Sequence, residues 1–558
     1  MDTRGTRSVG AVTRRGVLRA GAAGAALLLG ARANLLEAQV VEDPPYLGAT
    51  ILQLQALMAS GLTSRELTQA YLERIAQLNP LLHAVIETNP AAVSIAARLD
   101  RERRARRVRG PLHGIPVLVK DNIATDDQMQ TTAGSLALVD SRVPADALIV
   151  AQLRAAGAVI LGKANLSEWA NFRGLRPHGV LNGWSARGGF TRNPYVLDYD
   201  PAGSSTGSCV AAAANLCAAA VGTETAGSIV GPAGNNHVVG LKPTLGLVAQ
   251  DGIIPFAHSQ DAAGPVARTV RDVAILLGAL RSPFGDVAKH VPSPPTDYTR
   301  FLRRGALRGA RIGVDRRYFT PVFPGDAEII AVVEAALDVM RALGATVVDT
   351  DTGDASCYTA DMFTVFFFEF KVQIADYLAG LGDTSMRTLA DLIAFNLANC
   401  PREMKYFGQD LWLSSESTSG DLTDPLYLKA RAKCLELARK RGIDAALRGQ
   451  RLDAIVAPSY SGAAQAACVA GYPNISVPVG LRADGKPAGI WMYSGFLQEP
   501  RLLALAYDLE RALPPRAPPQ FLGAVPPDPP DAGICAAAAA GVPEKPAQIP
   551  AGCTGFLS

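Results

Sequence analysis

The spacing of apolar residues at the start of the chain predicts a helical region over residues 44–80. Thr63 and Glu66 have the spacing of a capping box, in which each side chain satisfies a backbone N–H of the other. Pro80 is expected to end the helix, because proline lacks the N–H that a helix interior needs. The apolar stripe of this helix has three- and four-residue spacing, at Leu67, Tyr71, Ile75 and Leu78.

Short apolar runs typical of buried strands alternate with longer helical patterns further along the chain. The strand candidates are residues 115–119, 158–161, 311–314, 346–348, 454–457, 475–479 and 489–493. The helical patterns include residues 145–156, 328–343 and 425–448. Alternation of this kind predicts an α/β fold with a largely parallel sheet that is covered by helices.

Both ends of the chain differ from this pattern. Residues 1–38 combine Arg14-Arg15 with an apolar stretch too short to span a bilayer and with cleavage points after Ala33 or Ala38. They are predicted to be a twin-arginine-type signal peptide, which directs the protein to the periplasm or out of the cell; a frayed basic tail is the alternative. Residues 516–558, rich in proline and alanine, are predicted to be an extended and weakly packed tail.

Composition excludes several classes of protein. Hydrophobic residues make up 48% of the chain and charged residues 19%, which excludes a largely disordered protein. The net charge of +3 argues against nucleic acid as a partner. The excess of positive charge lies in the first 33 residues, so the processed chain is slightly acidic. No later stretch is apolar enough for a membrane helix, so stable membrane insertion is not expected after processing.

The cysteines and histidines give no sign of a metal or cofactor site. None of the eight cysteines has C-x-x-C spacing, and the six histidines are scattered. We therefore expect no cofactor and no bound metal. Cys535 and Cys553 bracket a loop in the tail and are candidates for a disulfide in an oxidising compartment, a question that the sequence leaves open.

Candidate chemistry begins with Lys120, which closes the apolar strand candidate 115–119. A lysine at the end of a buried strand more often extends to solvent. If it is instead buried, desolvation lowers its pKa and prepares it to act as a base.

Two loops rich in glycine and serine follow Lys120. Residues 201–208 read PAGSSTGS and precede an alanine-rich stretch that is expected to form a tightly packed helix. Residues 222–233 read GTETAGSIVGPA, in which small residues before Ser228 allow several backbone N–H groups to face one point, as in an oxyanion hole. Neither phosphate-binding glycine motif is present, which disfavours a nucleotide loop.

Taken together, these motifs closely resemble the amidase signature family over residues 48–515. The matching segments include GIPV-x-x-KD at residues 114–121, the GSS-x-GS loop at 203–208, GLKPT at 240–244 and GYP at 471–473. The resemblance implies one large domain over residues 44–515, with a mixed, mostly parallel sheet of about ten or eleven strands covered by helices on both faces.

The resemblance also implies a Ser–Ser–Lys triad. Ser228 occupies the place of the nucleophile, Ser204 that of the bridging serine beside a cis peptide, and Lys120 that of the base. Ser205 stands in a supporting position. The oxyanion hole would consist of the backbone N–H groups of Thr225, Ala226, Gly227 and Ser228.

The chain departs from the family pattern at several positions. Ala226 stands where the family commonly has glycine, and it would narrow the oxyanion hole or fill a gap. Val230 replaces an arginine found in many members, so it offers no charge to an acidic substrate. Asn235 and Asn236 stand where residues are usually small or apolar, and the sequence gives no reason for them.

Three further segments resemble the secreted peptide amidases, which remove the C-terminal amide of peptides: residues 131–135, 167–174 and 183–189. The expected activity is therefore hydrolysis of a peptide or small-molecule carboxamide.

One alternative is an amidase or carbamate hydrolase of anilides, fatty amides or xenobiotics. Its apolar pocket would be lined by phenylalanines at 363, 366, 367, 368 and 370, which ordinary core packing also explains. The other alternative is an exported binding protein without activity. The oligomeric state is left open.

Overall fold

The computed structural model describes residues 44, 46–291, 293–321, 325–459 and 461–549. The signal peptide expected at residues 1–38 lies outside these described residues. No helix in the described ranges is long and apolar enough to cross a membrane.

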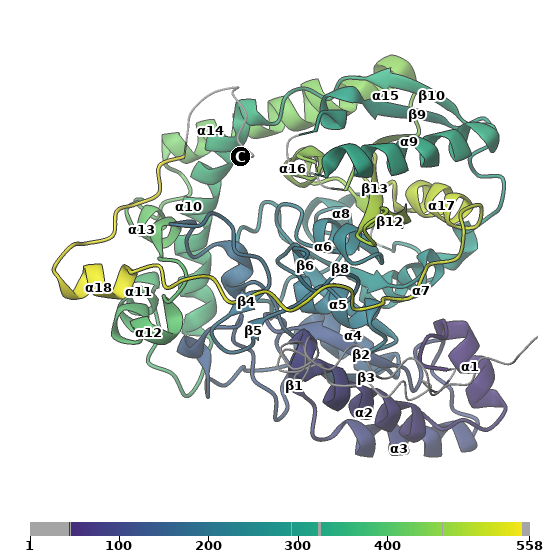
Figure 1. Cartoon of the computed structure of the whole chain (residues 1–558), viewed down its shortest axis with the longest axis horizontal. Coiled ribbons are helices and arrows are strands. Elements are labelled where there is room, and N and C mark those ends of the chain that lie inside the picture. The colour runs from purple at the N-terminus through teal and green to yellow at the C-terminus, as the bar shows by residue number, and fades with distance from the viewer. Residues whose placement is uncertain (1–43, 45, 292, 322–324, 460, 550–558) are drawn as a thin grey trace, which may run out of the picture. The chain divides into compact units, whose positions relative to one another are not determined.

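A mixed sheet of eleven strands organises the described chain from Tyr46 onward (Figure 1). In sheet order the strands are β1 (Val85–Thr88), β3 (Val159–Ala164), β2 (Pro116–Lys120), β6 (Ala219–Glu224), β8 (Ala262–Ala267), β7 (Val239–Lys242), β12 (Asn474–Leu481), β13 (Pro487–Tyr493), β11 (Ala454–Pro458), β9 (Arg311–Asp315) and β10 (Thr346–Thr350). A separate pair consists of β4 (Trp184–Ser185) and β5 (Gly189–Phe190).

The mixed eleven-stranded sheet agrees with the expected fold, and its parallel pairing is confined to two blocks. Strands β3, β2 and β6 are mutually parallel, as are β11, β9 and β10. The pairs between these blocks are antiparallel, from β6–β8 through to β13–β11. The first parallel block places the ends of β2 and β6 side by side, and both ends lead into the candidate site.

Helices flank the sheet. Those of the first half are α1 (Ile51–Ala59), α2 (Ser64–Leu82), α3 (Ala92–Arg104), α4 (Leu148–Ala155), α5 (Thr206–Ala213), α6 (Val230–Asn235), α7 (Val270–Leu280) and α8 (Gly285–His290). Those of the second half are α9 (Asp326–Ala342), α10 (Ser356–Ala379), α11 (Leu389–Ala398), α12 (Cys400–Glu403), α13 (Asp410–Glu416), α14 (Pro425–Leu435), α15 (Asp444–Gln450), α16 (Ala463–Ala470), α17 (Glu499–Glu510) and α18 (Ile534–Ala539). A π-helical segment, Glu436–Ile443, joins α14 to α15.

The start of α2 agrees with the expectation and its end does not. Thr63 and Glu66 form the capping box, with each residue's backbone N–H bonded to the side chain of the other. Pro80 lies inside the helix, which continues to Leu82. The helix ends instead at His83, which has a left-handed conformation.

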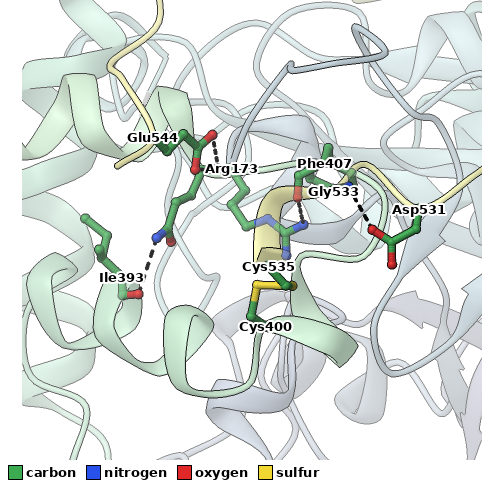
Figure 2. The surroundings of a disulfide bond; sticks show 9 residues. Arg173, Ile393, Cys400, Phe407, Asp531, Gly533, Cys535 and Glu544 are labelled. Atoms are coloured by element: carbon green, nitrogen blue, oxygen red, sulfur yellow. Dashed lines mark hydrogen bonds between the residues drawn. A yellow bond between two sulfur atoms is a disulfide. The ribbon is translucent and has the colours of Figure 1, made fainter. Parts of the chain in front are cut away.

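The described part of the tail, residues 516–549, contains no buried residue, in keeping with the expected weak packing, but it is anchored to the rest of the protein at several points. Cys535 in α18 is disulfide-bonded to Cys400 in α12, so it does not pair with Cys553 (Figure 2). The backbone N–H of Leu522 donates a hydrogen bond to the backbone carbonyl of Tyr195, and the backbone N–H of Leu197 donates one to the carbonyl of Leu522. The tail, yellow in Figure 1, is extended and is held to the body of the protein at these points.

The far end of the tail is held by the half-buried carboxylate of Glu544. Both oxygens of Glu544 accept a hydrogen bond from the backbone N–H of Gln409, at 2.9 and 3.0 Å. The backbone N–H of Ala547 donates to the carbonyl of Asp410. Composition gives no sign of these contacts, because they depend on a few polar atoms within a segment dominated by proline and alanine.

Candidate active site

Lys120, the last residue of β2, is fully buried. Its Nζ lies 2.7 Å from Ser204 Oγ, 3.1 Å from Ser205 Oγ and 3.0 Å from Thr223 Oγ1. Burial disfavours the charged ammonium and lowers the pKa of Lys120 from 10.5 to about 7. The lysine therefore does not extend to solvent, and a large fraction of it is neutral near pH 7.

Ser204 lies in a tightly packed loop that follows Gly203. The peptide bond between Gly203 and Ser204 is cis. A Cβ on Gly203 would lie 2.3 Å from Ser167 Oγ and 2.7 Å from Asn182 Oδ1, so a larger residue there would displace these side chains. The carbonyl of Ser204 accepts a hydrogen bond of 3.1 Å from the backbone N–H of Ser167. The next residues begin α5, which is buried along its whole length as expected.

Ser205 connects the lysine to the turn that contains Ser228. The backbone N–H of Ser205 donates to the carbonyl of Ser228 at 3.0 Å, and its hydroxyl donates to the carbonyl of Thr223 at 2.9 Å. Ser228 is 8% exposed. The structure thus gathers Lys120, Ser204, Ser205 and Ser228, from three separate stretches of sequence, at the ends of β2 and β6.

The turn before Ser228 has backbone donors available for a ligand. Among the described residues, no acceptor is hydrogen-bonded to the N–H groups of Thr225, Ala226 or Ser228. Gly227 has φ = 91°, a conformation that favours glycine. The side chain of Ala226 is exposed, so its methyl group fills no gap in the core.

Glu224, at the end of β6, fixes the other side of this turn. The carboxylate is buried, and its Oε2 accepts hydrogen bonds from the backbone N–H groups of Ile229 at 2.7 Å and Val230 at 2.9 Å. The Cys468 thiol in α16 donates to its Oε1. Glu224 is not among the residues predicted from the sequence. A carboxylate that ends a buried strand and precedes a glycine–serine turn is the signal that identifies it.

The unusual residues after Ser228 hold the loop that leads to Ser204. Asn235 Nδ2 donates to the carbonyl of Asp200, and Asn236 Nδ2 donates to the carbonyl of Pro201, each within 3 Å. Val230 is buried, and its carbonyl accepts a hydrogen bond from Trp491 Nε1. These contacts provide the structural reason for both asparagines.

A small cavity of about 20 Å³ adjoins the site. Thr223 and Thr225 line it on the side of the Ser228 turn, and Asn122 lines it beside Lys120. Asp261 also lines it and accepts a hydrogen bond of 2.6 Å from Thr225 Oγ1. Burial raises the pKa of Asp261. The rest of the wall is mainly apolar, from Ala133, Trp169, Ala170, Ile253, Ile254, Pro255 and Phe256.

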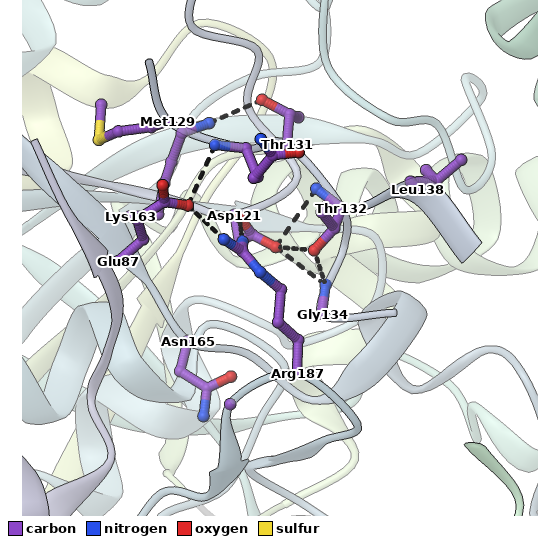
Figure 3. A network of polar contacts seen from close by, with 12 residues as sticks. Glu87, Asp121, Met129, Thr131, Thr132, Gly134, Leu138, Lys163, Asn165 and Arg187 are labelled. Atoms are coloured by element: carbon purple, nitrogen blue, oxygen red, sulfur yellow. Dashed lines mark hydrogen bonds and ion pairs between the residues drawn. The ribbon is translucent and has the colours of Figure 1, made fainter. Parts of the chain in front are cut away.

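A buried ionic network supports the cavity wall (Figure 3). Asp121, next to Lys120 in sequence, accepts hydrogen bonds from the Thr132 hydroxyl and from the backbone N–H of Gly134, and it pairs with Arg187 at 3.3 Å. The backbone carbonyl of Asp121 accepts a hydrogen bond from the backbone N–H of Ala133. The carbonyl of Ala133 in turn accepts one from the backbone N–H of Trp169. The network therefore fixes two residues of the wall.

The phenylalanines of α10 pack as core. Phe366, Phe368 and Phe370 are buried, and none of the five candidates lines the cavity. Phe366 contacts the cavity residue Phe256, with ring centroids 4.8 Å apart. These phenylalanines therefore pack with the core of the protein and do not form the wall of this cavity. Among the described residues, no group of three or more histidine, cysteine or acidic side chains is placed to hold a metal ion.

Comparison with known proteins identifies close relatives over most of the chain. A probable amidase of Arabidopsis thaliana is 40% identical over 481 residues, covering 83% of this chain and 89% of the relative. The crystal structure of a peptide amidase in complex with the competitive inhibitor chymostatin is 46% identical, with a TM-score of 0.80, covering 86% of this chain and 100% of the other. The native peptide amidase from Stenotrophomonas maltophilia is also 46% identical, with a TM-score of 0.79, covering 86% and 99%.

The family model named Amidase matches residues 66–467, a range that contains Lys120, Ser204 and Ser228. The ionic network, the glycine–serine loops and most of the sheet lie within the same range. The chain belongs to the amidase signature family and is an amide-hydrolysing enzyme.

Proposed function

We propose that this enzyme hydrolyses the C-terminal carboxamide of peptides to the free acid and ammonia through an acyl-enzyme intermediate on Ser228. The observation that carries the proposal is the buried contact of 2.7 Å between Lys120 Nζ and Ser204 Oγ. A lysine whose pKa is about 7 is available as a base at neutral pH, so the mechanism needs no histidine.

In the first step, neutral Lys120 takes the proton of Ser204 while Ser204 takes that of Ser228. Ser228 Oγ then forms a bond to the amide carbon, and the carbonyl electron pair moves to the oxygen. The free N–H groups of Thr225, Ala226 and Ser228 are available to hold that oxyanion. As the tetrahedral intermediate collapses, the C–N bond breaks and the nitrogen receives the proton through Ser204, leaving as ammonia.

In the second step, water attacks the acyl-enzyme. The same pair of residues accepts a proton from the water and returns one to Ser228 Oγ. The products are a peptide acid and the free enzyme. Ser205 positions Lys120 and Ser228, because its hydroxyl contacts the Lys120 amine and its backbone N–H donates to the carbonyl of Ser228.

The peptide amide substrate is favoured over the alternatives by the similarity to the two peptide amidase structures. The phenylalanines of α10 that are candidates to line an apolar pocket for anilides or fatty amides do not line the cavity beside Thr223 and Thr225. Val230 carries no charge to attract an acidic substrate. The disulfide between Cys400 and Cys535 supports an exported, oxidising location.

Mass spectrometry of one peptide in two forms tests the substrate. We expect the amidated peptide to gain one mass unit, as –NH2 is replaced by –OH, and the free-acid form to stay intact. Parallel assays with anilides, fatty amides and free amino-acid amides define the preference. Cleavage of internal bonds in both peptides, or turnover of anilides alone, would contradict the proposal.

A further inference from the structure

Thr225, the first residue of the turn that contains Ser228, is held by two consecutive buried side chains. Asp261 Oδ1 accepts a hydrogen bond of 2.6 Å from the Thr225 hydroxyl, and Gln260 Nε2 donates one of 3.0 Å to the Thr225 carbonyl. Gln260 is 3% exposed and Asp261 is 8% exposed, so neither bond competes freely with bulk water. The two bonds therefore fix two different atoms of Thr225, one in its side chain and one in its backbone.

The bond to the Thr225 carbonyl also sets the direction of the next N–H. A peptide group is planar, and in its trans form the C=O and the N–H point in opposite directions. The cis peptides among the described residues lie at 176–177 and 203–204, so the peptide that joins Thr225 to Ala226 is trans. Gln260 therefore turns the N–H of Ala226 away from itself. That N–H has no acceptor among the described residues.

The carboxylate of Asp261 is itself held by backbone groups. Its second oxygen, Oδ2, accepts hydrogen bonds from the backbone N–H groups of Phe256 at 2.8 Å and Ala257 at 2.9 Å. The backbone carbonyl of Ala257 in turn accepts from the N–H groups of Gln260 and Asp261. Residues 256–261 thus form a closed turn, and its last two side chains are the ones that hold Thr225.

Helix α10 supports the middle of this segment. The backbone N–H of His258 donates to Gln373 Oε1, and that of Ser259 donates to Glu369 Oε2, each at 3.0 Å. Glu369 is 2% exposed. The segment therefore has its own support from the protein, and it can in turn support Thr225.

We propose that Gln260 and Asp261 are positioning residues for the oxyanion hole. Gln260 orients the N–H of Ala226, and Asp261 fixes Thr225 through its hydroxyl. Donors stabilise a developing oxyanion most when they are already oriented, because no energy is then spent on turning them during the reaction. The inference rests on the proposed function, because it assumes that the oxyanion forms at the N–H groups of the Ser228 turn.

The first test replaces Gln260 with leucine, which removes the amide donor and keeps a similar volume. We expect kcat for a peptide amide to fall by on the order of 10–100-fold, with KM little changed. Gln152→Leu is the matched control. Gln152, on α4, also donates from Nε2 to a backbone carbonyl, that of Arg281 at 3.0 Å, and it does not line the cavity. The control should leave kcat and KM unchanged, and a rise in KM without a fall in kcat for Gln260→Leu would overturn the inference.

The second test separates the oxyanion from general packing. With a peptide aldehyde, Ser228 Oγ bonds reversibly to the aldehyde carbon, the carbonyl electron pair moves to the oxygen, and the serine proton passes through Ser204 to Lys120. The corresponding peptide alcohol has no carbonyl and binds without this bond. We expect Gln260→Leu to raise the Ki of the aldehyde by on the order of tenfold or more and to change that of the alcohol little. Equal changes in both Ki values would assign Gln260 a purely structural role and overturn the inference.

The third test changes Thr225 and leaves Gln260 in place, so it decides the question if the leucine variant does not fold. Thr225→Val removes the hydroxyl that Asp261 holds and keeps the shape of the side chain and the backbone N–H. Thr225→Ser keeps the hydroxyl. We expect the valine variant to lower kcat by on the order of tenfold and the serine variant to retain most of it. Equal kcat values for both variants and the unaltered protein would contradict the role of Asp261.

Failure of the proposed function gives a different result. If the unaltered protein hydrolyses no peptide amide, the proposed substrate is wrong whatever the variants do. The ratio of kcat between Gln260→Leu and the unaltered protein is then measured on the amide that is hydrolysed, and a ratio near one overturns the inference.

Discussion

The Cys468 thiol in α16 donates a hydrogen bond of 2.9 Å to the carboxylate of Glu224 at the end of β6, although 244 residues separate them. The other oxygen of Glu224 holds the two N–H groups that follow Ser228. Two distant parts of the chain thus meet behind the turn that contains Ser228, and the carboxylate keeps that turn in place.

Replacing Glu224 should therefore lower the rate of the chemical step. In Glu224→Ala, the N–H groups of Ile229 and Val230 lose their acceptor and the turn shifts relative to the substrate carbonyl. We expect kcat to fall by about 10²–10³, similar to the loss of an oxyanion-hole donor, with KM little changed. Cys468→Ala is the matched control. It should lower kcat by less than about tenfold, because it leaves both backbone contacts of Glu224 intact. A larger effect on KM than on kcat would contradict this role.

Ser228→Ala should abolish turnover while the protein still folds. Loss of a covalent nucleophile lowers kcat by several orders of magnitude, whereas removing one buried hydroxyl disturbs packing little. Steady-state assays and thermal unfolding measure the two effects. Ser94→Ala, on the exposed face of α3, is the control and should retain full activity. More than a few per cent residual activity in Ser228→Ala would refute the assignment.

The pH dependence of activity should follow Lys120. Only the neutral amine accepts a proton, so kcat/KM should rise with pH through about 7, the pKa to which burial lowers this lysine. Lys120→Met should lose activity by several orders of magnitude. A pH profile measured between 5 and 9 on peptide amides checks the first statement, and an active methionine variant with an unchanged profile would exclude Lys120 from the mechanism.

Stability should depend on pH through the same residue. In the unfolded chain the lysine has its ordinary pKa of 10.5, so folding must discharge it or bury the charge. This cost is greatest below pH 7 and disappears as pH rises towards 10.5. Lys120→Met lacks the cost, so its gain in Tm over the unaltered protein should be larger at pH 6 than at pH 9. An equal difference at both pH values would show that the lysine is not desolvated.

Removing the disulfide between Cys400 and Cys535 should destabilise the protein by about 2–4 kcal/mol, the typical contribution of such a bond. The bond joins positions 135 residues apart and holds α18 against α12. Urea unfolding of Cys400→Ser with Cys535→Ser measures the loss. Cys434→Ser, at a buried free cysteine, is the control for sulfur removal without loss of a crosslink. Identical unfolding midpoints for the double variant and the unaltered protein would contradict the prediction.

The proposed export can be tested on the N-terminal segment. We expect processed protein to begin after Ala33 or Ala38 and export to stop when Arg14 and Arg15 are both changed to lysine. N-terminal sequencing and cell fractionation are the measurements. Exported protein that retains Met1, or export of the lysine variant at normal levels, would contradict the signal-peptide assignment.

The sequence predicts most strands of the sheet but misses the edge strand β1 and the three adjacent strands β6, β8 and β7. Strands β2, β9 and β11 are apolar runs bounded by polar residues, so periodicity finds them. Strands β6, β7 and β8 contain Gly222, Gly240 and Gly264 and few β-branched residues, so they look unlike strands. The structure explains two of these glycines. A Cβ on Gly240 would lie 2.9 Å from the side chain of Ile229, and a Cβ on Gly264 would lie 2.1 Å from the carbonyl oxygen of Leu241.

The sequence likewise predicts some residues of the candidate site and misses the contacts of others. Lys120, Ser204 and Ser228 follow from motifs that are local in sequence. The contacts of Asn122, Glu224 and Cys468 depend on which strand ends are adjacent, and no local pattern gives that adjacency. The partner of Cys535 was missed for the same reason, since the nearer cysteine in sequence is not the one that the fold brings close.

The close packing of α5 restricts how this enzyme can be re-engineered. Each residue of Thr206–Ala213 is buried, and a Cβ on Gly207 would lie 2.3 Å from the carbonyl oxygen of Ala84. A mutant library that includes residues 203–213 would consist mostly of misfolded variants. Libraries aimed at new substrates should instead vary the wall formed by Ile253, Ile254 and Phe256, where larger or smaller side chains change the shape of the cavity and leave the serines in place.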